Sequence, residues 1–213
     1  MTERTVVHLL RHGEVLNPDK ILYGRLPGFH LSELGRQMAE RAAEHFAGRD
    51  VARIVSSPME RAQETAAPMA ERFGQAVTID ERLIEASNVY QGTHFGVGDG
   101  VLRHPRQWRH LYNPFRPSWG EPYAQVALRM RAAWQDARAR AAGHETVLVS
   151  HQLPIWISRL AAEHRHFVHD PRRRQCALAS VTSLHFEDDR LVSVSYVEPA
   201  ADLLPGAQKV AGA

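Results

Sequence analysis

The chain has 213 residues, of which 44% are hydrophobic and 23% charged, and its formal net charge at pH 7 is +2. This composition is typical of one globular domain, and no apolar run approaches the ~20 residues that a membrane-spanning helix needs. Nearly all of the 26 basic residues are arginine, but they are dispersed and accompany no nucleic-acid-binding motif. We therefore expect neither a membrane nor a nucleic acid as a partner.

The cellular compartment is predicted from two features of the chain. The first apolar run is too short for a signal peptide and is followed at once by Arg11 and His12. The single cysteine, Cys176, excludes an internal disulfide and suits a reducing environment. Both features favour a cytoplasmic protein.

Three short apolar runs end abruptly in polar residues and predict buried parallel strands. They lie at residues 6–10, 52–55 and 146–149. Helical periodicity follows them: apolar residues recur every four positions from Leu34 to Phe46, and a longer periodic stretch ends near Gly143. Strands that alternate with helices predict an α/β layered fold.

The end of the chain predicts a hairpin and a tail. The segments SVTSLHF and LVSVSYV flank the turn sequence EDDR, which is typical of a β-hairpin that closes a sheet. Residues 1–199 show no linker, so we interpret them as a single domain. The Ala/Gly-rich residues 200–213 are expected to be disordered.

Residues 86–122 break the alternation of strands and helices. They are rich in glycine, proline and aromatic residues and have no clean periodicity. We interpret this segment as an insertion that forms a lid over the sheet and sets the choice of substrate, because loops on a rigid scaffold commonly carry specificity.

Charged and polar side chains follow the ends of the three predicted parallel strands. Arg11 and His12 follow the first strand, and His151 follows the third. After the second strand, Ser57 and Glu60 form the pattern of a capping box, which places Arg61 in the first turn of a helix. The carboxyl ends of parallel strands meet at one edge of a sheet, so these side chains are expected to converge.

This set of residues predicts an anion site. Two guanidinium groups beside two imidazoles would repel a metal ion, and the nearby Glu14 does not stand in a known ligand spacing. Arginine forks and helix N-termini are suited to phosphate. We therefore expect a phosphate site that holds no metal.

Three motifs resemble those of the histidine phosphatase superfamily, which includes the cofactor-dependent phosphoglycerate mutases. They are LLRHGE, SSPMERAQETA and VLVSHQ, which stand in the expected order between Val6 and Trp156. The resemblance implies a three-layer α/β/α sandwich with a mostly parallel central sheet. It also implies that His12 becomes phosphorylated, that Arg11, Arg61 and His151 hold the phosphoryl oxygens, and that Glu85 is the acid/base carboxylate.

The chain departs from the family pattern at several positions. Val15 and Ser150 stand where relatives often have a hydroxyl residue and a glycine. Asn17, which by resemblance binds phosphate, sits one position closer to the first motif than usual. Glu121 lies in a turn that keeps the family's carboxylate and loses its hydroxyl, so it is the reserve candidate for the acid/base.

The resemblance implies a phosphomonoesterase that acts on a small phosphorylated metabolite and needs no cofactor. The alternative is a phosphoglycerate mutase, which usually carries a longer insertion than the one between Glu85 and His151. A non-catalytic phosphate-binding regulator is a third hypothesis. The residues His164 to Arg174 match no metal-ligand spacing and are interpreted as a basic surface connection, or as the source of an arginine that contacts an anionic substrate group. Assembly into a homodimer stays open.

Overall fold

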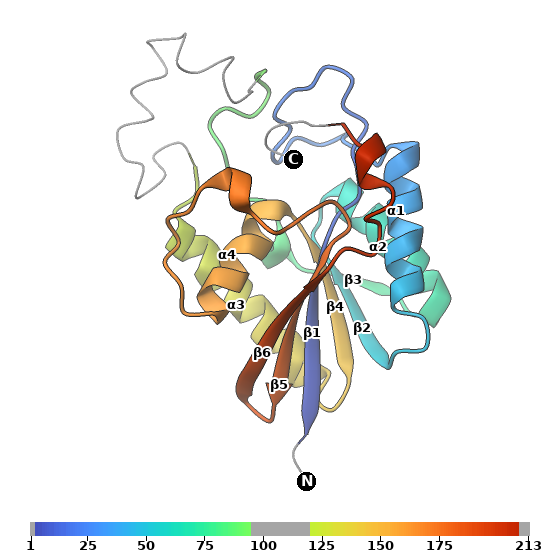
Figure 1. Cartoon of the computed structure of the whole chain (residues 1–213), viewed down its shortest axis with the longest axis vertical. Coiled ribbons are helices and arrows are strands. Elements are labelled where there is room, and N and C mark those ends of the chain that lie inside the picture. Colours follow the sequence, from blue (N-terminus) through green and yellow to red (C-terminus); the bar gives the residue numbers. More distant parts are fainter. Residues whose placement is uncertain (1–2, 95–119, 209–213) are drawn as a thin grey trace.

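The computed structural model describes residues 3–94 and 120–208, which form a six-stranded sheet with helices on both faces (Figure 1). The strand order is β3-β2-β4-β1-β5-β6. The first four strands in this order run parallel, whereas β5 and β6 pair antiparallel. The strands are β1 (Arg4–Arg11), β2 (Val51–Ser56), β3 (Val77–Ile79), β4 (Glu145–Ser150), β5 (Val181–Glu187) and β6 (Arg190–Val197).

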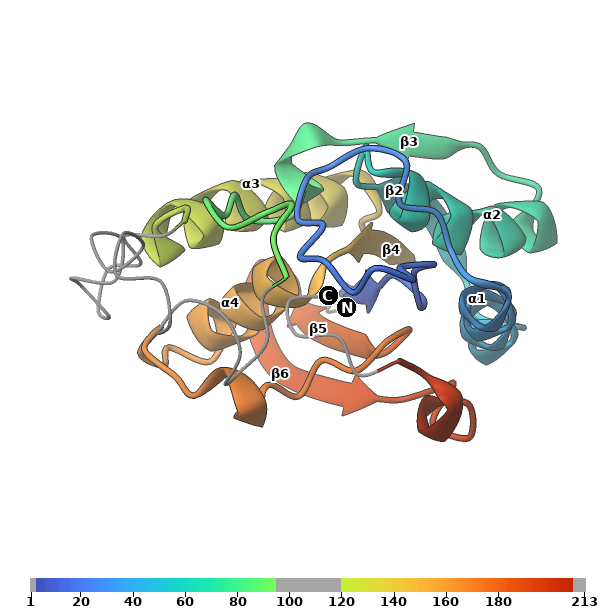
Figure 2. The same ribbon diagram turned by 90° about the horizontal axis from the view of Figure 1, so that it is seen from above.

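The helices form the two outer layers. Seen from above, α1 and α2 cover one face of the sheet, and α3 and α4 cover the other (Figure 2). The α/β/α sandwich implied by the sequence is thus confirmed. The helices are α1 (Glu33–His45), α2 (Glu60–Phe73), α3 (Tyr123–Arg140) and α4 (Gln152–Ala162), with short 3-10 turns at η1 (Glu81–Leu83), η4 (Pro171–Arg173) and η5 (Leu204–Gly206).

Alternating side chains of the central strands supply both halves of the core. In β1, Leu9 packs toward α3 and α4, while Leu10 packs toward α1 and α2. In β4, Leu148 packs toward α3 and α4, and Val149 packs toward α1 and α2. All four are fully buried, which explains why these strands appear in the sequence as continuous apolar runs.

The predicted helix boundaries hold for α1 and change for α2. Ser32 is the N-cap of α1, and its hydroxyl accepts from Gly35 N. In contrast, α2 begins at Glu60 with Met59 as its N-cap, so the predicted capping box at Ser57 is wrong. The carboxylate of Glu60 accepts from Gly28 N in another loop, which leaves Ser57 for a different contact.

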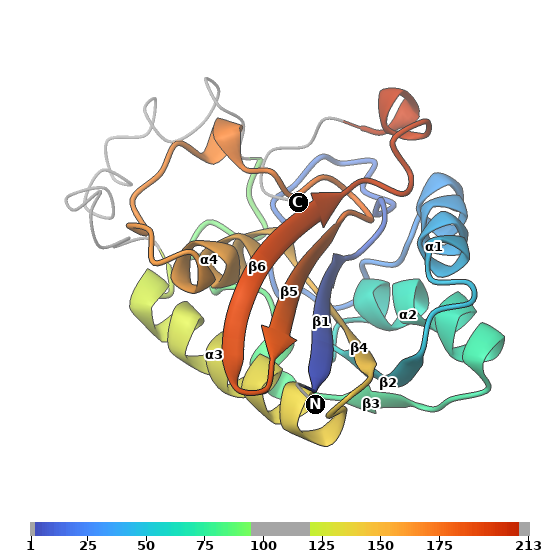
Figure 3. The ribbon, with the colours of Figure 1, turned by 60° about the horizontal axis from the view of Figure 1, so that its bottom comes forward.

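The C-terminal hairpin is confirmed (Figure 3). Strand β5 pairs with β1, and Asp188 adopts a left-handed conformation (φ +52°) in the turn to β6. The hairpin therefore extends the parallel part of the sheet with two antiparallel strands.

The predicted disorder of residues 200–213 is wrong for its first part. Ala200 is buried against Met38 of α1, and Leu204 packs on the same cluster. Gln208 N donates to a carboxylate oxygen of Glu14 at 2.6 Å. The apolar contacts with α1 explain why this Ala-rich segment is ordered, and residues 209–213 lie outside the described residues.

Most of the predicted insertion, residues 95–119, also lies outside the described residues. Its two described ends lie side by side: Asn88 forms an antiparallel bridge with Gly120, and Glu121 N donates to Ser87 O at 3.1 Å. The insertion therefore leaves and rejoins the fold through one narrow neck next to Glu85. Among the helices of the described ranges, none is both long and apolar enough to cross a membrane.

Candidate active site

His12 follows β1 directly, and its ring is fully buried at the carboxyl edge of the sheet. Its Nδ1 lies 2.8 Å from the carbonyl oxygen of Gly13. A carbonyl can only accept, so Nδ1 carries the ring hydrogen and Nε2 presents its lone pair. Within residues 3–94 and 120–208, Nε2 has no hydrogen-bond partner. The Nε2 lone pair of His12 is therefore available to a ligand or to a reacting atom.

The backbone beside His12 is packed closely against the start of α1. A Cβ added to Gly13 would lie 2.5 Å from the carbonyl oxygen of Gly35, so only glycine fits there without a shift. Gly13 N donates to Thr65 Oγ1 at 3.1 Å, and Thr65 in turn donates to Arg61 O at 2.7 Å. Thr65 thus connects the loop of His12 to the helix that carries Arg61.

Arg61 lies in the first turn of α2 and is fully buried. Its Nη2 donates to Gly24 O at 2.7 Å, and its guanidinium carbon lies 4.8 Å from the centre of the Tyr23 ring. Nε and Nη1 have no partner among the described residues. Burial lowers the pKa of Arg61, yet guanidinium stays protonated at neutral pH. A buried cation with two nitrogens that have no partner among the described residues is suited to an anionic ligand.

Arg11, the last residue of β1, is also buried. Its Nη1 donates to Cys176 O at 2.6 Å, which fixes the guanidinium from the side of the loop before β5. The backbone of β1 thus places Arg11 and His12 next to each other, and two loops orient their side chains.

His151 follows β4 and stands at the N-terminus of α4, with its ring centre 5.2 Å from that of His12. Its Nε2 lies 2.7 Å from Ser57 Oγ. The Ser57 hydroxyl accepts a long bond of 3.4 Å from Met59 N, and we assign its own hydrogen to the bond with Nε2. Nδ1 of His151 then carries the ring hydrogen, and it has no partner in the described part of the chain. His151 is therefore oriented as a neutral N–H donor.

Ser57 is a site residue that the sequence did not reveal. Its pattern with Glu60 indicated a helix cap, whereas the structure places its hydroxyl on His151, 94 positions further along the chain. Only the side-by-side placement of β2 and β4 brings these two residues together.

The pocket keeps both imidazoles neutral. Burial is the largest cause that lowers the pKa of His12 well below 6.5, and the charges of Arg61 and Arg11 lower it further. Burial, then Arg61 and then His12, lower the pKa of His151 in the same way. A histidine must be neutral to attack phosphorus, so this electrostatic environment favours the attacking form.

Glu85 lies just after η1, at the wall of a cavity of about 140 Å³. Its Oε1 accepts from Ala86 N at 2.7 Å. Burial raises the pKa of Glu85 above its usual value, against the lowering effect of that hydrogen bond and of the nearby arginines. A raised pKa favours the protonated acid, which is the form that can donate to a departing oxygen.

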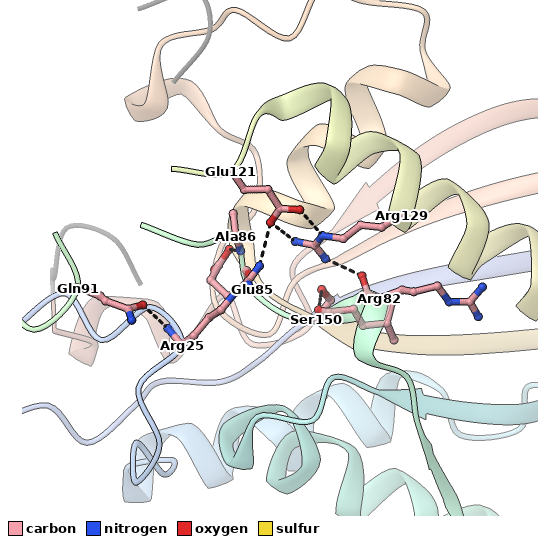
Figure 4. Close-up of polar contacts among 9 residues, drawn as sticks. Arg25, Arg82, Glu85, Ala86, Gln91, Glu121, Arg129 and Ser150 are labelled. Atoms are coloured by element: carbon pink, nitrogen blue, oxygen red, sulfur yellow. Dashed lines mark hydrogen bonds and ion pairs between the residues drawn. The ribbon is translucent and has the colours of Figure 1, made fainter. Parts of the chain in front are cut away.

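The backbone that carries Glu85 is held by three side chains from distant elements (Figure 4). Each donates to one carbonyl oxygen of this segment at 2.6 Å. The pairs are Arg25 Nε with Glu85 O, Arg129 Nη1 with Arg82 O, and Ser150 Oγ with Leu83 O. Ser150, one of the departures from the family pattern, therefore supports the segment of Glu85.

Glu121 joins two of these three donors. Its Oε2 accepts from Arg25 Nη2 at 2.9 Å, and its two oxygens accept from Arg129 at 2.8 and 3.1 Å (Figure 4). Both oxygens are thus engaged with guanidinium groups. This geometry is typical of an anchor, and it offers no free oxygen for proton donation to a substrate.

Asn17 is buried, and its amide closes a turn. Nδ2 donates to Ile21 O at 2.8 Å, and Oδ1 accepts from Ile21 N at 3.2 Å. One amide hydrogen is left for any contact with a phosphoryl oxygen. The structure therefore brings Asn17 to the loop after the first motif and gives its side chain a role in the shape of that loop.

The histidines of the loop after α4 do not gather around a common point. His169 Nδ1 lies 2.6 Å from Phe167 O, and its Nε2 accepts from Arg174 Nε at 2.9 Å. Asp170 accepts from Arg172 N at 3.0 Å. Across the described ranges, no three His, Cys, Asp or Glu residues are grouped as metal ligands.

The fold and this pocket define an α/β protein with an anion site at the carboxyl edge of its parallel strands. The chain belongs to the histidine phosphatase superfamily (branch 1), whose family model matches residues 7–199.

Three relatives show the range of this similarity. The uncharacterized protein Rv0525 of Mycobacterium tuberculosis is 57% identical over 201 residues, which cover 94% of this chain and all of the relative. The probable phosphoglycerate mutase GpmB of Yersinia pestis is 29% identical over 92% of both chains. Among solved structures, the mycobacterial glucosyl-3-phosphoglycerate phosphatase Rv2419c is 28% identical with a TM-score of 0.72, over 92% of this chain and 97% of that one.

Proposed function

We propose that this protein is a phosphomonoesterase that hydrolyses a small phosphorylated metabolite through a phosphohistidine on His12. The observation that carries the proposal is the buried, neutral His12, whose Nε2 has no partner among the described residues and which lies beside the unpaired N–H groups of Arg61. Phosphoryl transfer requires a nucleophile and hydrogen-bond donors for an anion in one buried pocket.

The first half-reaction transfers the phosphoryl group to the enzyme. His12 Nε2 attacks phosphorus, the N–P bond forms, and the ester P–O bond breaks. Arg11, Arg61 and the Nδ1–H of His151 stabilise the negative charge that spreads over the equatorial oxygens. Glu85 gives its proton to the departing oxygen, so that an alcohol rather than an alkoxide leaves.

The second half-reaction hydrolyses the phosphohistidine. The ionised Glu85 takes a proton from a water molecule, which attacks phosphorus while the N–P bond breaks. Inorganic phosphate leaves, His12 recovers its lone pair, and Glu85 is again protonated. Because the arginines supply the positive charge, we propose that the reaction runs without a metal and survives a chelator.

Glu85 is proposed as the acid and Glu121 as its support. The raised pKa of Glu85 and its place on the cavity wall favour it as a proton donor, and both oxygens of Glu121 accept from arginines. Asn17 remains a proposed phosphate ligand through its second amide hydrogen.

A phosphoglycerate mutase is the second candidate, supported by the 29% identity to GpmB. It would use the same pocket but return the phosphoryl group to a bound product. Hydrolysis is favoured by the similarity to the glucosyl-3-phosphoglycerate phosphatase. We further propose a cytoplasmic location, since the single cysteine is free and buried.

The test measures phosphate release from a panel of phosphomonoesters, with and without 2,3-bisphosphoglycerate. A phosphatase releases phosphate without the bisphosphate, and His12→Ala abolishes the release. Wild-type protein quenched without acid should carry an acid-labile phosphoryl group on His12. Interconversion of 2- and 3-phosphoglycerate that depends on the bisphosphate would establish the mutase. If the protein shows neither activity, the hypothesis of a phosphate-binding regulator is favoured.

A further inference from the structure

The cavity beside Glu85 lies where the leaving group of the substrate must be. If Glu85 protonates the ester oxygen, as in the proposed function, the carbon attached to that oxygen extends into this cavity. Its volume of about 140 Å³ is well below the ~300–1,000 Å³ of clefts for drug-sized ligands. The space therefore suits a leaving group of a few heavy atoms. Its lining includes Glu85, Tyr123, Gln152, Leu153, Pro171 and Arg174.

Arg174 is a cation of this lining that has no acidic partner among the described residues. Its Nε donates to His169 Nε2 at 2.9 Å, and its Nη1 donates to Gln152 Oε1 at 3.2 Å. Gln152 is neutral, and burial lowers the pKa of His169. The carboxyl group of Glu85 is close enough to attract Arg174, but it carries no negative charge in the protonated form that the proposed function requires, so it does not then compensate the charge of Arg174. By contrast, Arg172 pairs with Asp170 two positions away in the same loop.

The guanidinium of Arg174 is also held in place. The ring of His169, which accepts from it, packs against Tyr123 at 5.7 Å and Trp156 at 5.8 Å between ring centres. Arg174 is half-buried and burial lowers its pKa, so water solvates its charge less than that of an exposed arginine. A fixed, poorly solvated cation without a counter-ion binds an anion favourably, because little ordering entropy and little desolvation remain to be lost.

Glu121, the other acidic residue of the same lining, does not neutralise Arg174. Both of its oxygens accept from Arg25 and Arg129, and the resulting cluster has two cations for one anion. The cavity is therefore electropositive on the side where the leaving group enters.

We propose that Arg174 binds a carboxylate on the leaving group, so that the substrates are phosphate esters of small hydroxy acids. One planar guanidinium fork matches one carboxylate in geometry and charge, whereas a second phosphate, with about two negative charges, would be half neutralised. A carboxylate close to Glu85 also disfavours ionisation of that acid and so keeps its proton available. The inference rests on the proposed phosphatase function and specifies its substrate class.

The test compares two esters that differ only at the proposed contact. 3-Phosphoglycerate and glycerol 3-phosphate share a phosphorylated three-carbon chain, but the first has a carboxylate where the second has a hydroxymethyl group. Wild-type kcat/KM should favour 3-phosphoglycerate by about 10- to 100-fold, the range of one charge-assisted hydrogen-bonded pair. Arg174→Gln should remove this preference by lowering kcat/KM for 3-phosphoglycerate alone, and Arg174→Lys should keep part of it.

Arg173→Gln is the matched control, since Arg173 is an exposed neighbour of Arg174 whose side chain forms no ion pair among the described residues. It should leave both rates unchanged. Thermal melting of each variant reports whether the fold is retained.

Three results would overturn the subsite while the proposed function stands: equal wild-type rates on both esters, equal loss on both esters in Arg174→Gln, or the same effect from Arg173→Gln. Wild-type protein that releases no phosphate from either ester or from p-nitrophenyl phosphate would overturn the proposed function itself.

Discussion

Glu121 provides a sharp test of how the acid is positioned. We expect Glu121→Gln to destabilise the protein and to lower its activity only through Glu85. The substitution keeps the size of the side chain but removes the charge that Arg25 and Arg129 share. These two arginines donate to the carbonyl oxygens of Glu85 and Arg82, so the segment of the acid loses two of its three supports.

The cost to stability follows from the exposure of the three partners. The side chain of Glu121 is 13% exposed, and those of Arg129 and Arg25 are 17% and 32% exposed. Exposed ion pairs contribute about 0–1 kcal/mol, and breaking a buried pair costs about 3–5 kcal/mol. This partly exposed cluster lies between these limits, at about 2 kcal/mol. For a domain of this size the expected decrease in Tm is about 4–8 °C.

The kinetic effect should depend on the leaving group. A displaced acid should lower kcat for an alkyl phosphate by about 10- to 100-fold, while p-nitrophenyl phosphate, whose phenolate leaves unaided, is less affected. In a Glu85→Gln background, Glu121→Gln should have no further effect on the alkyl phosphate, because its action passes through an acid that is already absent. Thermal melting and initial rates on both substrates measure these outcomes.

Glu163→Gln is the matched control, because Glu163 also joins two arginines, Arg159 and Arg165, at the end of α4. It should lower Tm without a kinetic effect. The reasoning is refuted if Glu85→Gln keeps near-normal activity on the alkyl phosphate while Glu121→Gln loses about 10²–10⁴-fold, since Glu121 would then be the proton donor.

Four further predictions concern the proposed catalytic groups. Glu85→Gln should lower phosphorylation of His12 by an alkyl phosphate by about 10²–10⁴-fold, with a much smaller loss for p-nitrophenyl phosphate in burst kinetics; equal losses would contradict its role as acid. As pH is lowered, kcat/KM should fall only below pH 6.5, because the pKa of His12 is lowered. As pH is raised, kcat/KM should fall only above the usual pKa range of a glutamate, because the pKa of Glu85 is raised. The alkaline fall should be absent in Glu85→Gln. The free energy of unfolding should decrease as pH falls below 6.5, since unfolded histidines bind protons that the buried rings of His12 and His151 do not. Ser57→Ala should lower kcat about 10-fold without loss of the fold, because His151 loses the hydroxyl that selects its tautomer, and Ser57→Thr should retain activity; unchanged rates in Ser57→Ala would show that the tautomer does not depend on Ser57.

The local parts of this fold could be predicted from the sequence. Apolar runs identified β1, β2 and β4, and four-residue periodicity identified α1. Because parallel strands end at a common edge, the sequence also placed His12, Arg61 and His151 in one region. These predictions needed only contacts between neighbours in the chain and one general property of parallel sheets.

The tertiary structure decided the roles that depend on distant partners. Ser57 was predicted as a helix cap from its neighbours, but the pairing of β2 with β4 brings its hydroxyl to His151. Residues 200–208 have a composition typical of disorder, and they are ordered because α1 offers an apolar surface and Glu14 an acceptor.

The two candidate acids show the same division most clearly. In the sequence, Glu85 and Glu121 are carboxylates at the two ends of the insertion, and only the resemblance to the family favours Glu85 as the acid. In the structure, Glu121 accepts from two guanidinium groups, one from the loop between β1 and α1 and one from α3, whereas Glu85 lies on the cavity wall with its pKa raised by burial. A sequence specifies which groups can ionise, but the charge that each one carries depends on solvent access and on neighbours that only folding brings together.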